Sequence, residues 1–268
     1  MNNSGLTSII ILTHNGLSYT KKCLASLMEH TPEKIEIIVV DNASSDGTIA
    51  YLESLSGIIL IKNNENKGFP AGCNQGLNKA AGEYIVLLNN DTVVTKEWLK
   101  RLKWCLDHQP QAGIAGPRSN LVLPHQAVRQ VPYHSMEQMH NFANEFSQKN
   151  NQQGFQASHL SGLCMIFKHS LVEAIGGFDE RFSPGYFEDT DFSLRARIYG
   201  KKLWVANDVF IHHYGNSSFK TNRTLQIKTV KNSEKQFKEK WNIQDLSKIA
   251  RTADREKPFN PERHYVPF

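Results

Sequence analysis

Between residues 7 and about 116, short apolar runs alternate with segments whose apolar residues recur at helical spacing. The runs TSIIILTH, IEIIVVDN, GIILIKN and EYIVLLNND are rich in branched apolar residues, which is typical of buried strands. The segments SYTKKCLASLMEH, DGTIAYLESL and FPAGCNQGLNKAAG predict helices, with Ser18 capping the first and Gly82 ending the third. This alternation predicts an α/β fold with a mainly parallel central sheet and helices on both faces.

The second half of the chain is less regular at first. Residues 118–158 are rich in Gln, His, Asn and Pro, and we expect one helix there, around residues 136–146. Beyond it, SHLSGLCMIFKH predicts a strand, SLVEAIGG a short helix, FEDTDFSLRARIYG a longer helix and KLWVANDVFIHHYG one or two strands. Residues 224–241 predict an amphipathic closing helix with apolar positions Leu225, Val230, Phe237 and Trp241. Without a repeat or a clear linker, we expect one domain over residues 1–268.

Composition and charge narrow the class of protein. The 268 residues are 40% apolar, enough for a full core, and the apolar runs are far shorter than the roughly 20 residues that cross a bilayer. The N-terminus lacks a basic start and a cleavage site, so we expect no secretory signal and a cytoplasmic location. No C-x-x-C pair occurs, which predicts reduced thiols at Cys23, Cys73, Cys105 and Cys164.

The net charge of +5 is concentrated near the C-terminus, where residues 220–257 hold eleven Lys or Arg against five Asp or Glu. No nucleic-acid recognition motif accompanies this basic tail, so no nucleic-acid partner is expected. A solvated helix face is the favoured interpretation. Peripheral contact with the inner face of a membrane, or with an anionic acceptor, is the alternative. The sequence gives no indication of an oligomeric state.

Polar residues follow the predicted strands, where open α/β sheets bind their ligands. They are Thr13, His14, Asn15, Asp41, Asn42, Asn89, Asn90 and Asp91. No G-x-x-x-x-G-K-[ST], G-x-G-x-x-G, H-E-x-x-H or G-x-S-x-G motif occurs, which removes the best support for familiar nucleotide loops and hydrolases. Oxygen donors at Asn89 and Asp91 suit Mg²⁺ or Mn²⁺, and a helix-capping turn is the alternative.

Besides Asp41 and Asp91, a third acidic site lies in GYFEDTDFSLR. It consists of Glu188, Asp189 and Asp191. With these acids included, the chain resembles the glycosyltransferases of family two, which have the GT-A fold. It resembles especially their rhamnosyltransferase-like bacterial members. Such enzymes are inverting and use nucleotide-sugar donors. The matching stretches occur in family order over about residues 7–218: SIIILTHNG, VVDNASSDGT, NKGFPAGCNQGL, GEYIVLLNNDT, SGLCMIFKHSLVEAIGGFDERF, FEDTDFSLR and IHHYGNSS.

The resemblance implies a donor site for a nucleotide-diphosphate sugar. Asp41 would accept a hydrogen bond from the uracil or thymine of a UDP- or dTDP-sugar, although it could instead cap a helix. Asn74 would lie near the ribose and diphosphate, and Gly68 and Gly72 would let the backbone approach the ligand. The remaining residues implied in this site are Thr13, His14, Asn15, Asn42, Lys67, Asn89 and Asn90.

The resemblance also implies a divalent metal, Mn²⁺ or Mg²⁺. Asp91 matches the last residue of the D-x-D metal motif, whose first position is Asn89 in this chain. Of the two histidines in IHHYG, His212 is favoured as the further metal or diphosphate contact because the glycine falls three residues later. His213 is the close alternative.

The acids of FEDTD are implied to face the acceptor. Asp189 would be the general base, while Glu188 and Asp191 would position acceptor or sugar hydroxyls. Asp191 is also spaced to pair with Arg195 at i, i+4. Helix capping by all three acids is the alternative, since carboxylates are favoured at a helix start.

The implied activity is metal-assisted transfer of a sugar to a hydroxyl of a saccharide or lipid-linked acceptor. The implied division is a nucleotide-sugar-binding half at residues 7–116, an acceptor and catalytic half at 117–218, and a basic helical tail at 219–268. A non-catalytic nucleotide-sugar- or glycan-binding module on the same scaffold is an alternative. A nucleotidyltransferase is another, but THNGLSYT lacks the basic, glycine-rich loop expected after its first strand.

Overall fold

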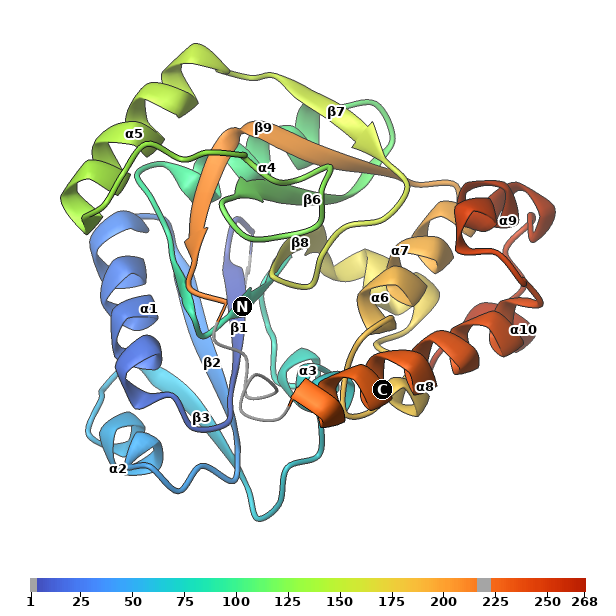
Figure 1. The fold of residues 1–268 in the computed structure, drawn as a ribbon, viewed down its shortest axis with the longest axis horizontal. Helices are drawn as coiled ribbons and strands as arrows, with labels where there is room; N and C mark the ends of the chain where they lie inside the picture. Colours follow the sequence, from blue (N-terminus) through green and yellow to red (C-terminus); the bar gives the residue numbers. More distant parts are fainter. Residues whose placement is uncertain (1–3, 216–222) are drawn as a thin grey trace.

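The fold is a twisted α/β sheet flanked by helices, seen in the computed structural model of Figure 1, which describes residues 4–215 and 223–268. The strand order in the described residues is β3-β2-β1-β4-β8-β6-β9-β5, and β7 pairs with β9. The strands are β1 (Thr7–Thr13), β2 (Ile35–Asn42), β3 (Ile58–Asn63), β4 (Tyr84–Asn89), β5 (Thr92–Val93), β6 (Ala112–Ser119), β7 (Gly154–Ala157), β8 (Cys164–Lys168) and β9 (Lys202–His213).

Strands β1 to β4 are parallel, as are β6 and β9, whereas β8 runs antiparallel between β4 and β6. The predicted mainly parallel sheet is therefore confirmed. The helices are α1 (Leu17–His30), α2 (Thr48–Glu53), α3 (Phe69–Leu77), α4 (Trp98–His108), α5 (Met136–Lys149), α6 (His169–Ile175), α7 (Glu188–Ile198), α8 (Arg223–Trp241), α9 (Ile249–Arg255) and α10 (Pro261–His264).

Strand β1 shows why both faces need helices. Alternate side chains of a strand point to opposite faces, and Ile9, Ile10 and Ile11 are all fully buried. Ile9 and Ile11 belong to the core that includes α1, α2 and α4, while Ile10 belongs to the core that includes α3, α6 and α7. Each face of the sheet thus has its own apolar layer.

Two predicted helix boundaries were wrong. Helix α1 is capped by Gly16 in a left-handed conformation rather than by Ser18. Helix α3 ends at Leu77, five residues before Gly82. Gly82 is instead required because a Cβ there would lie 2.7 Å from the backbone nitrogen of Ser8, at the start of β1. This glycine permits close backbone packing and does not terminate a helix.

The basic tail is more than a solvated helix face. Phe237 and Trp241 of α8 are buried and pack with Phe182 and Leu194 in a separate apolar cluster, although Leu225 is 51% exposed. Helix α8 therefore packs against the segment that leads into α7 (Figure 1). None of the described helices is long and apolar enough to cross a membrane. The four cysteines are free and buried.

Candidate active site

The sheet register brings the candidate donor residues to one edge. Thr13 at the end of β1 pairs with Asp41 of β2, and Leu12 pairs with Asn89 of β4. Because these strands are parallel, the residues that follow them leave the sheet at the same carboxyl edge, where such folds bind ligands.

Asp41 is fully buried at this edge. Its Oδ2 accepts the backbone N–H of Ser44 at 2.9 Å within the loop after β2, and it does not cap α2, whose N-cap is Gly47. Its Oδ1 is buried and has no hydrogen-bond partner among the described residues. A buried carboxylate oxygen without a partner is costly, so Asp41 keeps one acceptor suited to a ligand N–H.

The loop after β1 is held by polar contacts at the same edge. Asn15 has a left-handed backbone, φ 61°, and its Oδ1 accepts the backbone N–H of Ser45 at 2.8 Å. His14 Nδ1 lies 2.6 Å from the carbonyl oxygen of Asn42. Asn90 Nδ2 donates to the hydroxyl of Thr13 at 3.2 Å. The loop is thus ordered by contacts between the ends of β1, β2 and β4.

Two amides of the implied donor set are engaged by protein. Asn42 is buried; its Nδ2 donates to the carbonyl of Gly68 at 3.1 Å, and its Oδ1 accepts from Asn63 at 2.8 Å. Asn74 is 3% exposed, and its amide donates to the carbonyl of Phe178 and accepts the Phe178 N–H, both at 2.8 Å. Asn42 and Asn74 therefore hold neighbouring loops together through their side-chain amides.

The glycines of this segment also serve packing between protein groups. A Cβ on Gly68 would lie 2.3 Å from Ser183 Oγ, and one on Gly72 would lie 2.5 Å from Leu12 Cδ2. Neighbouring protein atoms therefore already leave little room for a side chain at either glycine. Lys67 is exposed, and its carbonyl accepts the Ser183 hydroxyl at 3.2 Å.

Asp91 meets His213, not the favoured His212. Strand β5 pairs with the end of β9, placing Thr92 opposite His213. His213 Nε2 lies 3.1 Å from Asp91 Oδ1, and His213 Nδ1 lies 2.7 Å from the carbonyl oxygen of Leu121. Both ring nitrogens of His213 thus face oxygen atoms that accept hydrogen bonds. A hydrogen on each nitrogen would satisfy this arrangement, and so would a cation bound between Nε2 and the Asp91 carboxylate.

His212 points into an aromatic group. Its Nδ1 lies 2.7 Å from the Tyr133 hydroxyl, and its ring packs against Tyr133 and Tyr214. Burial, with the neighbouring His213, lowers the pKa of His212 to about 4. The preference for His212 is corrected because successive residues of a strand face opposite sides, and only His213 faces Asp91.

The pair formed by Asp91 and His213 fits a divalent cation. A metal-ligating histidine usually donates its other N–H to a carbonyl or carboxylate, and Leu121 supplies such a carbonyl. No group of three or more His, Cys, Asp or Glu gathers as a metal cage within residues 4–215 and 223–268. Two protein ligands leave positions for diphosphate oxygens and water, as Mg²⁺ usually keeps.

The proposed base, Asp189, sits in the first turn of α7 and is half-buried. Its Oδ2 accepts the Gly162 N–H at 2.8 Å, and its Oδ1 accepts the Thr190 N–H at 2.7 Å. Next to it, Glu188 is 6% exposed and its Oε2 is buried without a partner among the described residues. Burial and the nearby Asp189 raise the pKa of Glu188 well above its usual value, which favours the neutral acid.

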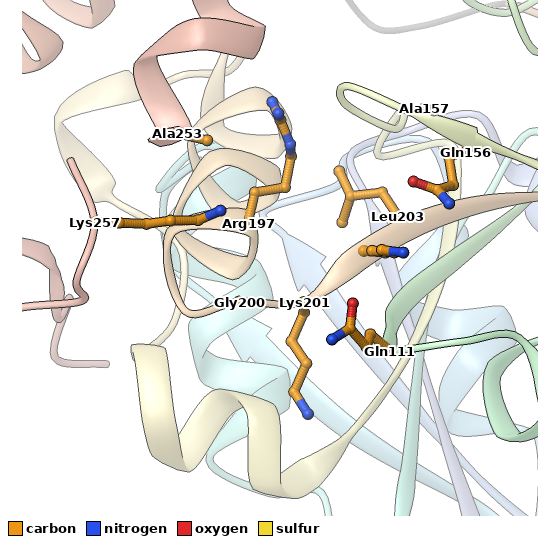
Figure 2. A pocket seen from close by; sticks show the side chains of 10 residues that line it. Gln111, Gln156, Ala157, Arg197, Gly200, Lys201, Leu203, Ala253 and Lys257 are labelled. Atoms are coloured by element: carbon orange, nitrogen blue, oxygen red, sulfur yellow. The ribbon is translucent and has the colours of Figure 1, made fainter. Parts of the chain in front are cut away.

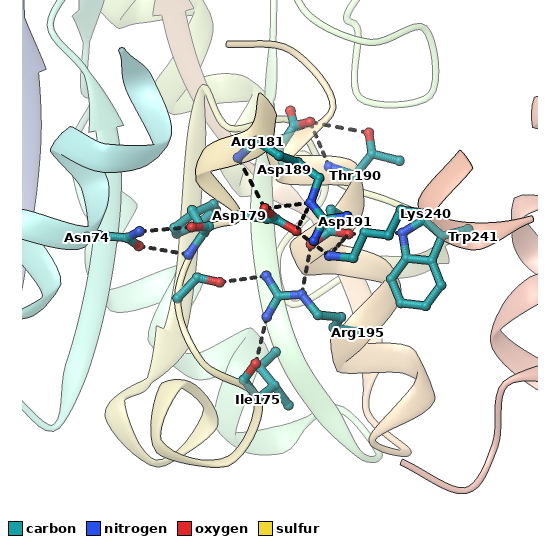
Figure 3. A network of polar contacts seen from close by, with 12 residues as sticks. Asn74, Ile175, Asp179, Arg181, Asp189, Thr190, Asp191, Arg195, Lys240 and Trp241 are labelled. Carbon is teal, nitrogen blue, oxygen red and sulfur yellow. Dashed lines mark hydrogen bonds and ion pairs between the residues drawn. The ribbon is translucent and has the colours of Figure 1, made fainter. Parts of the chain in front are cut away.

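Asp191 has a different place from the one expected. It is fully buried, and its Oδ2 accepts from Arg195 Nε at 2.8 Å, the predicted i, i+4 pair. Its Oδ1 lies 2.6 Å from Lys240 Nζ and accepts the Trp241 Nε1–H at 2.9 Å (Figure 3). Both carboxylate oxygens are thus bonded inside the protein, so Asp191 is not open to a substrate hydroxyl.

A short series of backbone contacts joins Asp189 to the end of β4, which precedes Asp91. Gly162 donates to Asp189, and the carbonyl of the next residue, Leu163, accepts the N–H of Asn89 at 3.0 Å. Asn89 is two residues from Asp91. These contacts link the first turn of α7 to the end of β4, just before Asp91. Sequence reasoning did not single out Gly162, because its role is played by a backbone N–H, which no side-chain pattern marks.

A cavity lies away from these residues, at the other end of α7. Its volume is about 210 Å³. Figure 2 shows the side chains that line it, beside the start of β9. Basic side chains line much of it: Arg197, Lys201, Lys202 and Lys257. None of the candidate site residues borders it. The stretch Asn216–Ser218 of the IHHYGNSS motif lies outside the described residues.

Comparison with known proteins supports one family. The model of Glycosyl transferase family 2 matches residues 8–176. An uncharacterized glycosyltransferase of Haemophilus influenzae is 31% identical over 38% of this chain, which spans 33% of that protein's length. An N-acetylglucosaminyl-diphospho-decaprenol L-rhamnosyltransferase of Mycobacterium tuberculosis is 26% identical over 78% of this chain and 76% of its own.

Solved structures share the fold. A mannosyltransferase from Pyrobaculum calidifontis, in complex with GDP-Man and Mn²⁺, matches with a TM-score of 0.63 and 18% identity, over 93% of this chain and 68% of its own. TarS 1-349 of S. aureus, in complex with UDP-GlcNAc, matches with a TM-score of 0.63 and 19% identity, over 93% and 71%. The fold is thus the expected GT-A fold, and with the family model covering more than half of its length this chain belongs to glycosyl transferase family 2.

Proposed function

We propose that this chain transfers a sugar, with inversion, from a UDP- or dTDP-sugar to a hydroxyl of a saccharide or lipid-linked acceptor. The observation that carries the proposal is the series of backbone contacts that runs from Asp189 through Gly162 and Leu163 to Asn89, two residues before Asp91. An inverting reaction needs a base and a leaving-group site on opposite sides of one sugar. In this proposal Asp189 is the base and Asp91 belongs to the leaving-group site.

The donor side rests on Asp41, Asp91 and His213. The buried Oδ1 of Asp41 is suited to accept the imide N–H of uracil or thymine. The carboxylate of Asp91 and Nε2 of His213 are suited to hold a divalent cation. When bound, the cation would neutralise negative charge on the departing nucleoside diphosphate. The remaining donor residues expected from the sequence, Lys67 and Asn89 among them, stay proposals for contacts to the diphosphate.

On the acceptor side, Asp189 would take the proton of the attacking hydroxyl. Its two hydrogen bonds from backbone N–H groups fix the direction of the carboxylate. Glu188, held neutral by burial, would donate a hydrogen bond to a sugar hydroxyl. A lipid-linked acceptor is supported by the M. tuberculosis relative, whose name gives a decaprenol-linked sugar as its acceptor.

The test is release of nucleoside diphosphate from a panel of UDP-, dTDP- and GDP-sugars with Mn²⁺, for wild type and Asp189→Asn. We expect turnover with a uridine or thymidine donor and a loss of at least ~100-fold in Asp189→Asn. Asp254→Asn, an acid 72% exposed on α9, is the matched control and should retain full activity.

A thermal-shift measurement with UDP checks that Asp189→Asn keeps its donor pocket, because a bound ligand raises stability. Tight donor binding without turnover in the wild type would support the non-catalytic module instead. Equal turnover by wild type and Asp189→Asn would overturn the assignment of the base.

A further inference from the structure

Helix α8 contacts residues 185–191, which include the first turn of α7, at four points. Ser233 Oγ donates to the carbonyl of Gly185 at 2.9 Å, and Gln226 Nε2 donates to the Tyr186 hydroxyl at 3.0 Å. The rings of Phe237 and Phe187 lie 5.3 Å apart. Lys240 and Trp241 reach Asp191. One helix therefore follows the whole segment that ends in the acids of α7.

The backbone of this segment is one that side chains rarely adopt. Tyr186 and Phe187 have φ of 72° and 71°, in the left-handed region. Such conformations cost of order 1–3 kcal/mol each and persist only where the surroundings over-determine them. In this chain the contacts from α8 supply that constraint, and Asp189 follows two residues after Phe187.

The strongest of these contacts is a buried network of charges. Lys240 is 8% exposed, and its Nζ lies 2.6 Å from Asp191 Oδ1 and 2.7 Å from Asp179 Oδ2 (Figure 3). Arg195 pairs with Asp191 and donates to the carbonyl of Ile175 at 2.7 Å, and the more exposed Arg181 pairs with Asp179 at 2.8 Å, so three cations meet two carboxylates. Burial opposes the charged form of Asp191, but Lys240 and Arg195 outweigh it and hold its pKa below the usual value.

We propose that α8 is a positioning element of the active site and that Lys240 is its positioning residue for Asp189. Lys240 fixes Asp191, and thereby the first turn of α7, so that the carboxylate of Asp189 stays on the Gly162 N–H and faces the acceptor. The inference rests on the proposed function of Asp189 as the base. Helix α8 lies wholly outside residues 8–176, so the family match does not include it.

The test compares Lys240→Met, which keeps the length of the side chain and removes its charge, with Lys240→Arg. Lys235→Met is the matched control, because Lys235 lies on the same helix, its side chain is 74% exposed, and its ion-pair partner among the described residues, Glu239, is exposed as well. We expect Lys240→Met to lower kcat by ~10- to 100-fold, since small misplacements of reacting groups have effects of that size. The donor KM and the affinity for UDP should change less than about twofold, and Lys240→Arg should recover most of kcat.

Amide hydrogen exchange gives a second readout that does not depend on turnover. The N–H groups of Gly162 and Thr190 are bonded to Asp189 and should exchange faster in Lys240→Met but not in Lys235→Met. If the wild type transfers no sugar, the proposed function fails, and exchange at these two amides still decides whether α8 holds Asp189.

Two results would overturn the inference. One is a folded Lys240→Met protein, binding UDP normally, with kcat and exchange unchanged. The other is an equal loss of kcat and UDP affinity, which indicates general damage. Should Lys240→Met fail to fold, Ser233→Ala removes only the contact to Gly185 and is judged on the same readouts, with an expected loss in kcat of ~3- to 10-fold.

Discussion

Replacing Asp191 by Asn removes the charge at the centre of the buried network and keeps the side chain's volume. Asp191 and Arg195 are both fully buried, and Lys240 is 8% exposed. The change leaves Arg195 without its carboxylate partner, and it leaves Lys240 with Asp179 alone, a carboxylate that Arg181 also pairs with. Removing one partner of a buried ion pair typically costs about 3–5 kcal/mol, because the remaining charge is uncompensated.

Urea or thermal unfolding measures this cost. A loss of 3–5 kcal/mol corresponds to a fall in Tm of about 6–20 °C for a chain of this size. Glu53→Gln is the control: Glu53 and Lys62 form an ion pair at 2.6 Å, but both are about half exposed, so no more than ~1 kcal/mol is expected.

The sign of the pH dependence gives an internal check. The folded-state pKa of Asp191 is lowered from the ordinary value of 3.8, so its contribution is present above that pH and lost as pH falls through the folded value. The gap in stability between wild type and Asp191→Asn should therefore narrow below about pH 4. A cost under 1 kcal/mol at pH 7, equal to that of Glu53→Gln, would refute the account of this network.

Three further predictions concern the donor edge and β9. His213→Ala should raise the Mn²⁺ concentration needed for half-maximal turnover by at least ~10-fold, whereas His212→Ala should leave it within twofold; the reverse order would restore the original preference. Asp41→Ala should weaken UDP binding by ~10- to 100-fold, measured by calorimetry, and unchanged affinity would exclude a base contact. Burial lowers the pKa of His212 to about 4, so wild-type stability should fall as pH drops from about 6.5 to about 4; His212→Gln should lack that part of the decline, and identical pH profiles would contradict it.

The fold could be predicted because its signal is repeated along the chain. Ile9, Ile10 and Ile11 in succession already require a strand covered on both faces, and the polar residues after β1, β2 and β4 then share one edge. The choice between His212 and His213 could not be made in the same way. It depends on which side of β9 faces Asp91, and this is set by the pairing of β5 with β9.

The sequence pattern also could not predict the protein contacts of Asn42, Asn74 and Asp191. A polar side chain bonded to protein and one bonded to a ligand look alike in a motif. Besides the predicted pair with Arg195, Asp191 is bonded to Lys240 and Trp241, about 50 residues later in the chain. Long-range partners of this kind leave no periodicity or spacing near the residue they bind.

The most direct test of the central claim is a crystal structure with Mn²⁺ and UDP, in which anomalous scattering locates the metal. The account predicts Mn²⁺ at about 2.1 Å from a carboxylate oxygen of Asp91. It further predicts His213 Nε2 as a second ligand, uracil on Asp41, and Asp189 across the position of the sugar from the diphosphate. Metal bound by neither Asp91 nor His213, or a nucleotide bound away from the ends of β1 and β2, would contradict it.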